Sequence, residues 1–430
     1  RYGLDSAPEP GMLVRVPFGR RDVVGLICEV TTHSDVPANK LRDVSAVCAA
    51  CPPLSAQWLA LAGFAADYYQ RGLGEVALPA LPQALRDSSR WARLLAPEER
   101  YRLSPQGRAE LPDALPARAQ ALRRLAQALV DAGELDAAAA RALHPKAIAT
   151  LEAWCEAGWV EHESIAVGAA ASAAHSAPQT AAMVDVPRLS DEQAEAVEAI
   201  GAASGFAPFL LHGVTGSGKT EVYLRALAAL LERDLGAQAL VLVPEINLTL
   251  HSGLAEGERA RNWLAAHTGR ARIVLGTRLA VLASLPRLSM LVIDEVHAPA
   301  YKQQEGLRYS ARDLAVWRAK QLGVPVVLGS ATPSLESWWQ AEQGRYTRLT
   351  LSRRAIADAV LPTVKLIDLE EERRRGRASF EGLSGPLVAA MKARLERGEQ
   401  SLVFLNRRGY APTLACDACG WVAGCPRCSA

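Results

Sequence analysis

The stretch Gly213-Val214-Thr215-Gly216-Ser217-Gly218-Lys219-Thr220 lies between a short apolar run at 209–211 and a helical pattern of apolar residues at 222–230. A strand, a glycine-rich loop and a helix in this order match the pattern GxxxxGK(S/T). Glycines let backbone N–H groups close around phosphates, and the helix N-terminus adds partial positive charge. We therefore expect this stretch to bind ATP or GTP, with Lys219 at the terminal phosphates and Thr220 on Mg²⁺. A flexible loop before a helix is the alternative for the motif taken alone.

The composition indicates a folded protein with several domains. The chain has 430 residues, of which 50% are hydrophobic, and a net charge of +2. This length predicts roughly two to four domains, and so small a charge means that a nucleic-acid partner must be argued from local patches. No apolar run reaches the ~18 residues of a membrane-spanning helix, and the first residues do not resemble a signal peptide. We expect a cytoplasmic protein without membrane contact. Because Arg1 stands where a Met would, we also expect residues to precede it.

Residues 1–90 are predicted to form a small β-rich domain. Apolar residues at 14–18 and 23–30 flank a turn and predict a β-hairpin, and the spacing at 54–70 predicts a helix. The arginines of the hairpin favour either DNA contact or a solvated tip, and the sequence leaves both open. The CxxC pair at 48–51 has no second pair nearby, which does not favour zinc.

Three helical stretches, at 117–131, 135–142 and 145–157, are followed by a strand and predict a winged-helix domain over 110–164. Such domains often bind DNA, but they also serve as spacers or protein contacts, and few basic residues fall on the third helix. The Ala- and Ser-rich stretch 165–187 then predicts a linker.

From 188 to 350, short apolar runs alternate with helical patterns, which predicts a parallel sheet covered by helices. The strand runs are 207–211, 239–243, 272–275, 290–293 and 326–328. A parallel crossover needs about a dozen residues or more, and the interval after 239–243 leaves little room for one. We therefore expect a segment to be missing near Thr249–Leu250. Strand candidates 364–368 and 402–405 lie in the region 351–415, which we expect to connect to an incomplete second lobe.

An acidic pair follows the buried run 290–293, in Asp294-Glu295-Val296-His297. The C-terminal end of a buried strand is where phosphoryl-transfer enzymes hold Mg²⁺ and orient the attacking water. We assign Mg²⁺ to Asp294 together with Thr220, and water activation to Glu295. The DExH pattern alone is weak, but it becomes strong downstream of a phosphate-binding loop. The predicted catalytic residues are Lys219, Asp294 and Glu295.

Polar turns at two other strand ends extend the pattern. Ser330-Ala331-Thr332 is typical of the helicase turn that links nucleotide state to DNA contact, and we assign His297, Ser330 and Thr332 to this coupling. Arg278, which follows Gly276-Thr277, is placed to contact phosphates of a nucleic-acid strand. Taken singly, each turn is also explained by an ordinary strand-to-helix connection.

The stretch 301–313 interleaves aromatic and basic residues around Gly306. Aromatic rings stack on unpaired bases and cations hold the backbone, which suits single-stranded DNA. The alternative is a surface loop that caps the sheet. The predicted DNA-binding residues of this loop are Tyr301, Lys302, Tyr309 and Arg312.

Four cysteines near the end of the chain form two CxxC pairs separated by five residues, Cys416 with Cys419 and Cys425 with Cys428. Paired CxxC units indicate zinc. The two pairs either close one tetrahedral site in 416–430 or each supply half of a separate site, completed by cysteines beyond residue 430.

In combination, these motifs resemble the PriA family of bacterial primosomal replication-restart helicases, in helicase superfamily 2. The matching stretches extend over essentially the whole chain. They are 213–223, Leu242-Val-Pro-Glu-Ile246, 301–313, 329–336, Leu405-Asn-Arg-Arg-Gly-Tyr410 and, near the N-terminus, 14–19, 66–69 and 74–75.

The resemblance implies an ATP-dependent DNA helicase that moves 3′→5′, recognises stalled or repaired replication forks and promotes primosome assembly and replication restart. It implies an N-terminal domain that binds the 3′ end of a leading strand, with Tyr2 in that pocket, and an adenine contact for Gln193. The implied fold is multidomain α/β, with a winged helix and a RecA-like lobe.

The implied cofactors are ATP, Mg²⁺ and Zn²⁺. Two zinc sites, each bound by two separated CxxC pairs, favour the split-site alternative. The implied partners are forked and single-stranded DNA, single-stranded-DNA-binding protein and primosome or helicase-loading proteins, for a monomer associated with the bacterial nucleoid.

Departures from the family pattern bear on activity. Val296 stands where the family usually has Glu, with little effect expected, and Leu307 stands where an aromatic is frequent, which weakens stacking. We expect the parent protein to continue past 430 and the chain as given to hydrolyse ATP poorly. The alternatives to a helicase are a DNA-fork-binding scaffold of the same fold, which the intact Lys219 and Glu295 oppose, and a nucleotide-metabolising kinase, which the 301–313 loop and the cysteines oppose.

Overall fold

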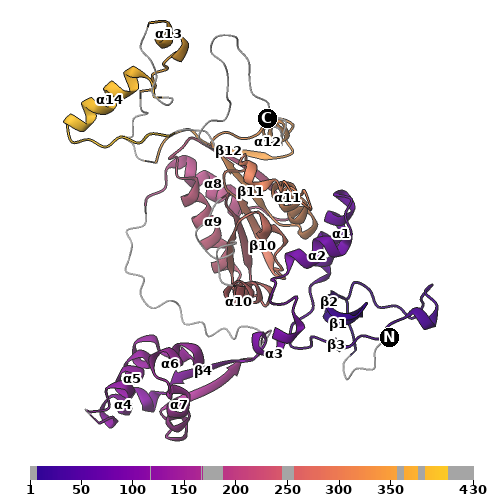
Figure 1. Cartoon of the computed structure of the whole chain (residues 1–430). Helices are drawn as coiled ribbons and strands as arrows, with labels where there is room; N and C mark the ends of the chain where they lie inside the picture. The colour runs from indigo at the N-terminus through magenta and orange to yellow at the C-terminus, as the bar shows by residue number, and fades with distance from the viewer. Residues whose placement is uncertain are drawn as a thin grey trace. The chain divides into compact units, whose positions relative to one another are not determined.

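The computed structural model describes residues 7–116, 118–165, 167, 187–244, 256–355, 363–375 and 383–404. The chain divides into two units, Arg1–Asp358 and Ala359–Ala430. The first unit contains two three-stranded sheets and a six-stranded sheet (Figure 1). In the part of the chain that the structure describes, no helix is both long and apolar enough to cross a bilayer.

The N-terminal region forms the predicted hairpin and helix. Strands β1 (Leu13–Phe18) and β2 (Arg21–Leu26) pair antiparallel, and β3 (Ala46–Val47) pairs with β1. Ser55 caps the next helix, because its hydroxyl accepts from the backbone N–H of Trp58 over 3.2 Å. The helical elements are η1 (Ala38–Lys40), α1 (Ala56–Tyr68), α2 (Leu73–Ala80), η2 (Ser88–Arg90) and α3 (Trp91–Leu94).

Helix α1 shares one hydrophobic core with the large sheet. Trp58 is 3% exposed, and its indole N–H donates to Leu282 O over 2.7 Å. Phe64 stacks on Trp317 of α11 (Ala311–Leu322), with ring centroids 4.2 Å apart. Truncating a buried tryptophan typically costs about 3–5 kcal/mol. The N-terminal helices and the large sheet are therefore held together by packing as well as by the chain.

A second compact region covers the residues that we expect to form a winged-helix domain. Its three helices and terminal strand are confirmed, and the structure adds a strand and a helix before them that the sequence analysis missed. Leu111, Leu125 and Leu151 are fully buried at its centre. The sheet order is β5-β4-β6. The elements are β4 (Glu98–Leu103), α4 (Pro105–Ala114), α5 (Gln120–Ala132), β5 (Glu134–Asp136), α6 (Ala137–Leu143), α7 (Ala147–Glu156) and β6 (Val160–Ile165).

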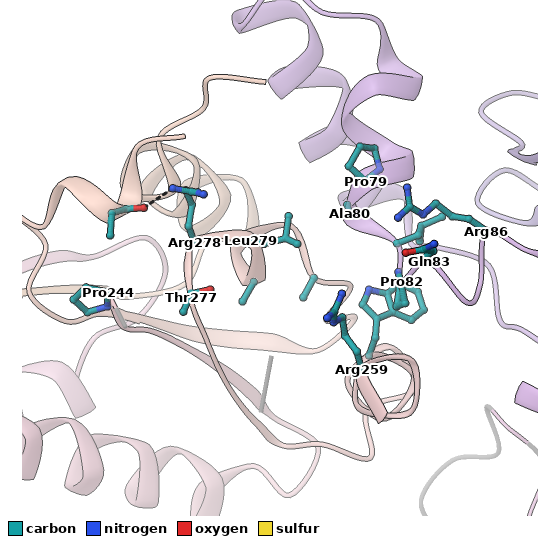
Figure 2. Close-up of a pocket in the computed structure, with 15 residues that line it drawn as sticks. Pro79, Ala80, Pro82, Gln83, Arg86, Pro244, Arg259, Thr277, Arg278 and Leu279 are labelled. Carbon is teal, nitrogen blue, oxygen red and sulfur yellow. Dashed lines mark hydrogen bonds between the residues drawn. The ribbon is translucent and has the colours of Figure 1, made fainter. Parts of the chain in front are cut away.

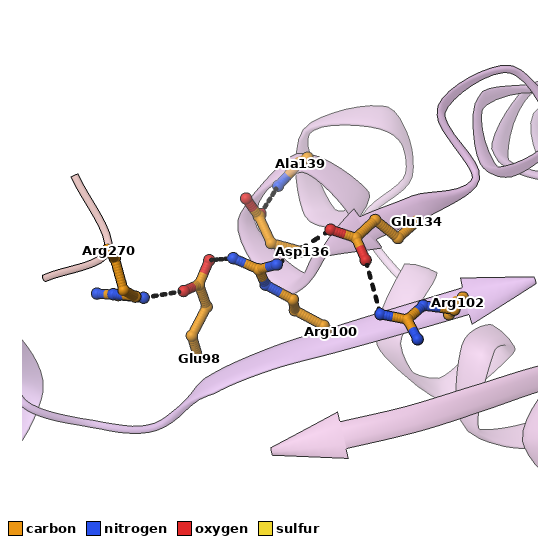
Figure 3. Close-up of polar contacts among 7 residues, drawn as sticks. All are labelled: Glu98, Arg100, Arg102, Glu134, Asp136, Ala139 and Arg270. Carbon is orange, nitrogen blue, oxygen red and sulfur yellow. Dashed lines mark hydrogen bonds and ion pairs between the residues drawn. The ribbon is translucent and has the colours of Figure 1, made fainter. Parts of the chain in front are cut away.

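Charged residues on β4 explain why its pattern was missed. Glu98 pairs with Arg100 at 3.5 Å and with Arg270 at 2.6 Å, while Glu134 pairs with Arg100 and Arg102 (Figure 3). These ion pairs lie near the surface, where each contributes about 0–1 kcal/mol. The contact between Glu98 and Arg270 is therefore too weak to fix the small domain on the lobe by itself.

The large sheet confirms the five predicted strand runs. Its order is β12-β7-β11-β10-β8-β9, and every neighbouring pair is parallel. Parallel strands joined by helical crossovers give the predicted α/β lobe. The strands are β7 (Pro208–Gly213), β8 (Gln238–Leu242), β9 (Ile273–Gly276), β10 (Leu288–Ile293), β11 (Val326–Ser330) and β12 (Thr347–Leu351).

Helices cover both faces of this sheet (Figure 1). Helices α8 (Asp191–Gly201) and α9 (Lys219–Arg233) pack on one face, against residues such as Leu211, Val241 and Val292. On the other face α10 (Glu256–His267), η3 (Arg278–Leu282) and α11 pack with α1 against Leu210, Leu240 and Leu291. Successive strand residues thus point to opposite cores, as expected for a sheet buried on both sides.

The expectation of a missing segment near Thr249–Leu250 stays a prediction, although a crossover from β8 to β9 is present. Helix α10 lies between β8 and β9 and provides the crossover that the parallel pairing requires. The sequence analysis overlooked this helix because its apolar residues are few, while Glu256, Glu258 and Arg259 dominate its first turn. The junction itself lies outside the described residues.

The strand candidates 364–368 and 402–405 were also wrong over the residues that the structure describes there, 364–368 and 402–404. Val364 is 79% exposed and Phe404 is 81% exposed, so neither run packs on a core or pairs with a neighbouring strand among the described residues. A short apolar run needs such a partner to become a strand. The remaining helices are η4 (Pro299–Tyr301), α12 (Leu335–Glu342), α13 (Leu369–Arg374) and α14 (Gly385–Glu396).

His267 makes the core between the N-terminal region and the lobe sensitive to acid. Its Nε2 donates to Pro52 O over 2.8 Å and its Nδ1 lies 2.9 Å from Ser284 Oγ. Burial lowers the pKa of His267 below its ordinary value of about 6.5. In the pH window below that value the unfolded chain binds more protons, so this contribution to stability is complete above about pH 6.5 and is lost as the pH falls further.

We therefore expect His267→Gln to lose less thermal stability than the unmodified protein between about pH 8 and pH 5. Each kcal/mol corresponds to roughly 2–4 °C in Tm for a domain of this size. Thermal unfolding followed at several pH values measures the difference. His33→Gln, at an exposed histidine, serves as the control and should keep the original pH dependence. Parallel Tm profiles for the His267 variant and the unmodified protein would contradict the assignment.

Candidate functional site

The phosphate-binding loop joins the end of β7 to the start of α9. Gly216 and Gly218 have φ angles of +80° and +79°, in the left-handed region that glycine adopts at little cost. A Cβ at Gly213 would lie 2.5 Å from Ser217 Oγ, and a Cβ at Gly218 would lie 2.3 Å from Gln193 Nε2. The loop is therefore wrapped so tightly that these positions exclude side chains. Thr220 follows, exposed on the first turn of α9.

Polar groups inside this loop suit a phosphate ligand. Lys219 is 8% exposed, and its Nζ donates to Gly213 O over 3.0 Å and lies 3.9 Å from Glu295 Oε1. Ser217 Oγ is buried and makes no hydrogen bond with the described residues. Buried polar atoms normally have partners. Among the described residues, this cation is held by a carbonyl and a distant carboxylate and lies near a hydroxyl without a partner, which fits the triphosphate of a nucleotide.

Gln193 holds the loop from the side. Its side-chain oxygen accepts from Ser190 N and its Nε2 donates to Ser217 O, both over 2.9 Å. The first bond belongs to the capping box that starts α8. The structure thus places Gln193 against the loop, and the adenine contact implied by the resemblance stays a prediction.

Two tyrosine hydroxyls hold Asp294 at the end of β10. Tyr223 of α9 donates to Asp294 Oδ1 over 3.1 Å, and Tyr301 donates to the Asp294 carbonyl over 2.6 Å. Burial and the neighbouring Asp294 carboxylate raise the pKa of both tyrosines above the ordinary value, so both remain donors. Asp294 is therefore fixed through its side chain and its backbone at once.

Glu295 has a strained backbone. Its φ of +45° lies in the left-handed region, where residues other than glycine are uncommon. Such a conformation costs on the order of 1–3 kcal/mol and persists only where the surroundings impose it. Val296 N donates to Gly329 O over 2.9 Å just after it, which ties the turn to β11.

The acidic turn meets the polar turn after β11. His297 Nδ1 lies 2.8 Å from Ser330 Oγ and 3.5 Å from Glu295 Oε2. Thr332 N donates to the same Ser330 oxygen over 2.9 Å, which leaves the hydroxyl proton of Ser330 for His297. The structure thus brings together the three residues predicted for coupling, next to Glu295.

The prediction that Tyr301 and Tyr309 stack on DNA bases was wrong for both residues. Their side chains are 3% and 4% exposed and belong to the core shared by α1, α11 and the sheet. Burial raises the pKa of Tyr309 to about 12. A ring enclosed by the protein cannot present its face to a base, so these aromatics support the loop from inside.

The basic residues of the same region differ in whether their side chains are engaged in contacts with the protein. Arg278 donates to Ala300 O over 2.8 Å and so braces the start of the 301–313 loop. Arg312 donates to Ser334 Oγ over 3.1 Å and pairs with Asp313 at 2.8 Å. Lys302 is exposed, and its ammonium lies 5.5 Å from the centroid of the Tyr69 ring. Tyr2 and the four C-terminal cysteines lie outside the described residues.

Sequence reasoning missed residues that support the site through a single hydrogen bond. Tyr223 was one of several apolar positions on α9, and nothing in that pattern indicated its bond to Asp294. Tyr69, at the end of α1, accepts from Ser310 N over 3.0 Å, and Arg71 donates to Gly306 O over 3.2 Å. The N-terminal region therefore contacts the 301–313 loop directly.

Gly329 shows how closely the site is packed. A Cβ there would lie 1.5 Å from Tyr223 Oη. We expect Gly329→Ala to displace the Tyr223 ring, cost about 1–3 kcal/mol of stability and weaken the hold on Asp294. Chemical unfolding and nucleotide binding measure the two effects. The control is Gly201→Ala, where a Cβ meets open space. Equal stability and equal nucleotide binding for the two variants would refute this account.

Comparisons with known proteins agree with this geometry. Residues 1–82 match the model of the 3′DNA-binding domain (3′BD), and residues 190–338 match that of the DEAD/DEAH box helicase. The replication restart protein PriA of Haemophilus influenzae is 37% identical over 99% of this chain, which covers 58% of that relative. The PriA of Bacillus subtilis is 42% identical over 56% of this chain, or 32% of its own length.

The DUF1998 helicase MrfA bound to DNA matches 39% of this chain and 28% of its own, at 16% identity and a TM-score of 0.28, a likeness too weak to bear on fold or function. The sequence relatives carry the assignment. The chain spans just under three fifths of the Haemophilus influenzae protein. Over the part that it spans, the chain is therefore similar to the replication restart proteins PriA.

Proposed function

We propose that this chain carries the DNA-binding and ATP-binding parts of a 3′→5′ DNA helicase that recognises stalled or repaired replication forks and promotes primosome assembly. The observation that carries the proposal is that the N-terminal DNA-binding region and the lobe with the ATP site share one hydrophobic core. The helices that follow the 3′DNA-binding hairpin pack, through Trp58 and Phe64, on the lobe whose strand β10 ends at Asp294. A DNA-binding region and an ATP site built on one core are what a DNA-dependent ATPase requires.

The residues of the site have separate roles in ATP hydrolysis. ATP supplies the phosphoryl group, and Thr220 and Asp294 are the oxygen donors that would hold its Mg²⁺. Lys219 lies with its ammonium inside the loop, ready to exchange the Gly213 carbonyl for phosphate oxygens. Glu295, at a strained turn that faces the loop, orients the attacking water and takes its proton.

The 301–313 loop links DNA to this chemistry. Its first residue bonds to the Asp294 carbonyl, while Tyr69 and Arg71 of the N-terminal region bond to Ser310 N and Gly306 O. A bound DNA strand that shifts the loop would therefore also move the end of β10, because Tyr301 bonds to the Asp294 carbonyl. Lys302 and Arg312 remain our candidates for contact with that strand, and Arg278 braces the loop from below.

Zinc and protein partners complete the proposal. Four cysteine thiolates are a donor set that suits Zn²⁺, and Cys416, Cys419, Cys425 and Cys428 would hold it. Single-stranded-DNA-binding protein and helicase-loading proteins are the proposed partners, for a monomer in the bacterial cytoplasm. We expect the chain as given to turn over ATP slowly.

The competing proposal is a fork-binding scaffold without turnover, and Lys219 distinguishes the two. In the full-length protein we expect Lys219→Ala to lose DNA-stimulated ATP hydrolysis by on the order of 10²-fold or more. Glu295→Gln should bind ATP but hydrolyse it roughly 10²–10⁴-fold more slowly. Steady-state ATPase with and without forked DNA measures both.

Lys320→Ala, at an exposed lysine of α11, is the matched control and should behave like the unmodified protein. A full-length protein that binds forked DNA, but whose rate of ATP hydrolysis does not change on binding it, would favour the scaffold. ATP turnover that requires a small phosphate acceptor and is indifferent to DNA would favour a kinase.

The coupling role of Tyr301 can be tested by removing one oxygen atom. Tyr301→Phe keeps the buried ring but loses the bond to the Asp294 carbonyl, worth about 0.5–1.5 kcal/mol. We expect a roughly 2–10-fold lower DNA-stimulated kcat with unchanged affinity for DNA. Tyr68→Phe, at a tyrosine that is 65% exposed, is the control. A purely structural role would instead lower Tm and leave kcat per folded molecule intact.

A further inference from the structure

A cavity of about 460 Å³ lies between the end of α2 and the large lobe (Figure 2). One wall comes from the N-terminal region, with Pro79, Pro82 and Arg86, and the opposite wall from the lobe, with Thr277, Arg278 and Leu279. The two walls are fixed relative to each other. Leu81 and Leu85, which flank the first wall, are 1% and 0% exposed and belong to the same buried cluster as Trp263 and Leu282 of the lobe.

The cavity has apolar sides and a cationic rim. Three arginines line it, Arg86, Arg259 and Arg278, and none of the described residues that line it is an aspartate or a glutamate. Arg86 is exposed, and its guanidinium has no ion-pair partner within the described part of the chain. Arginines on apolar walls without carboxylates select a ligand that combines an anion with a flat apolar part.

Trp263, on α10, adds a second indication. Its side chain is 4% exposed and lines the cavity, and its indole N–H has no acceptor among the described residues. A buried indole N–H normally finds an acceptor. Within the described part of the chain, the wall of this cavity therefore has a hydrogen-bond donor without an acceptor, in addition to its positive charge.

The position of the cavity selects the ligand. Thr277 and Arg278 stand directly after β9, at the carboxyl edge of the sheet where the acidic turn after β10 also lies. Ligands of open parallel sheets bind at this edge. A volume of about 460 Å³ is in the range of pockets that bind small molecules, roughly 300–1,000 Å³, and it accommodates one nucleotide unit rather than a duplex.

We propose that this cavity binds a nucleotide unit of single-stranded DNA, with its base between the proline-rich wall and Leu279 and its phosphate on Arg86. The proposal rests on the proposed DNA-dependent function and deepens it. The DNA strand bound by the helicase lobe then passes Arg86 of the N-terminal region, while Arg278 shapes the lobe side of the cavity through its bond to Ala300 O. The N-terminal region then senses both the end of a strand and its entry into the motor.

The experiment measures binding of a fluorescein-labelled oligo(dT) by anisotropy across a range of salt concentrations. Arg86→Glu should weaken binding by on the order of five- to tenfold, and Arg86→Ala should lower the salt dependence of log Kd by about 0.7, the value for one phosphate contact on a single strand. Arg86→Lys keeps the charge and should keep most of the affinity. A photo-crosslinking residue in place of Leu279, which is 48% exposed, should attach to the oligonucleotide.

Arg93→Glu is the matched control, because Arg93 is exposed on α3 and does not line the cavity. The proposal is overturned if Arg86→Glu binds oligo(dT) as tightly as Arg93→Glu, or if residue 279 forms no crosslink. The outcome is separable from the proposed function. If Arg86 variants lose DNA affinity while DNA fails to stimulate ATP hydrolysis in the unmodified full-length protein, the nucleotide site stands and the helicase proposal falls.

Discussion

The structure depends on the hold that two buried tyrosines keep on Asp294. Tyr223 reaches it from the helix that begins at the phosphate-binding loop, and Tyr301 reaches its carbonyl from the loop that follows the acidic turn. Position 329 is a glycine because the Tyr223 hydroxyl occupies the space that a Cβ would need. A carboxylate fixed in this way responds to both elements. Movement of the phosphate-binding helix or of the 301–313 loop therefore changes the geometry at the end of β10.

The second constraint is the common core of the N-terminal region and the lobe. Trp58, Phe64 and His267 join them through a hydrogen bond, a ring stack and a buried imidazole. This packing positions Tyr69 and Arg71 on the 301–313 loop and Arg86 on the cavity beside Arg278. The small helical domain is tied less firmly, since the ion pair between Glu98 and Arg270 is near the surface. The residues around the phosphate-binding loop are thus joined more firmly to the N-terminal region than to the small helical domain.

The elements that follow from periodicity and from glycine-rich turns could be predicted from the sequence. The roles of side chains that depend on whether the residue is buried could not. The five strand runs and the P-loop could be predicted because a parallel strand buried on both faces is continuously apolar and because few loops need so many glycines. The burial of Tyr301 and Tyr309 could not, since an aromatic residue in a basic loop has the same sequence pattern whether it faces a base or a core. Helix α10 and strand β4 were missed because charged residues mask their apolar faces. Val364 and Phe404 misled because apolar runs form strands only beside a partner.

The central claim is that DNA bound by the N-terminal region raises the rate of ATP hydrolysis at the phosphate-binding loop. It is tested most directly by the ATP hydrolysis rate of the full-length protein with a forked DNA that has a 3′ leading-strand end at the branch, compared with no DNA. The account predicts that the fork raises kcat and that most of this increase is lost when the 3′ end is removed. A rate that is the same with and without the fork would contradict it.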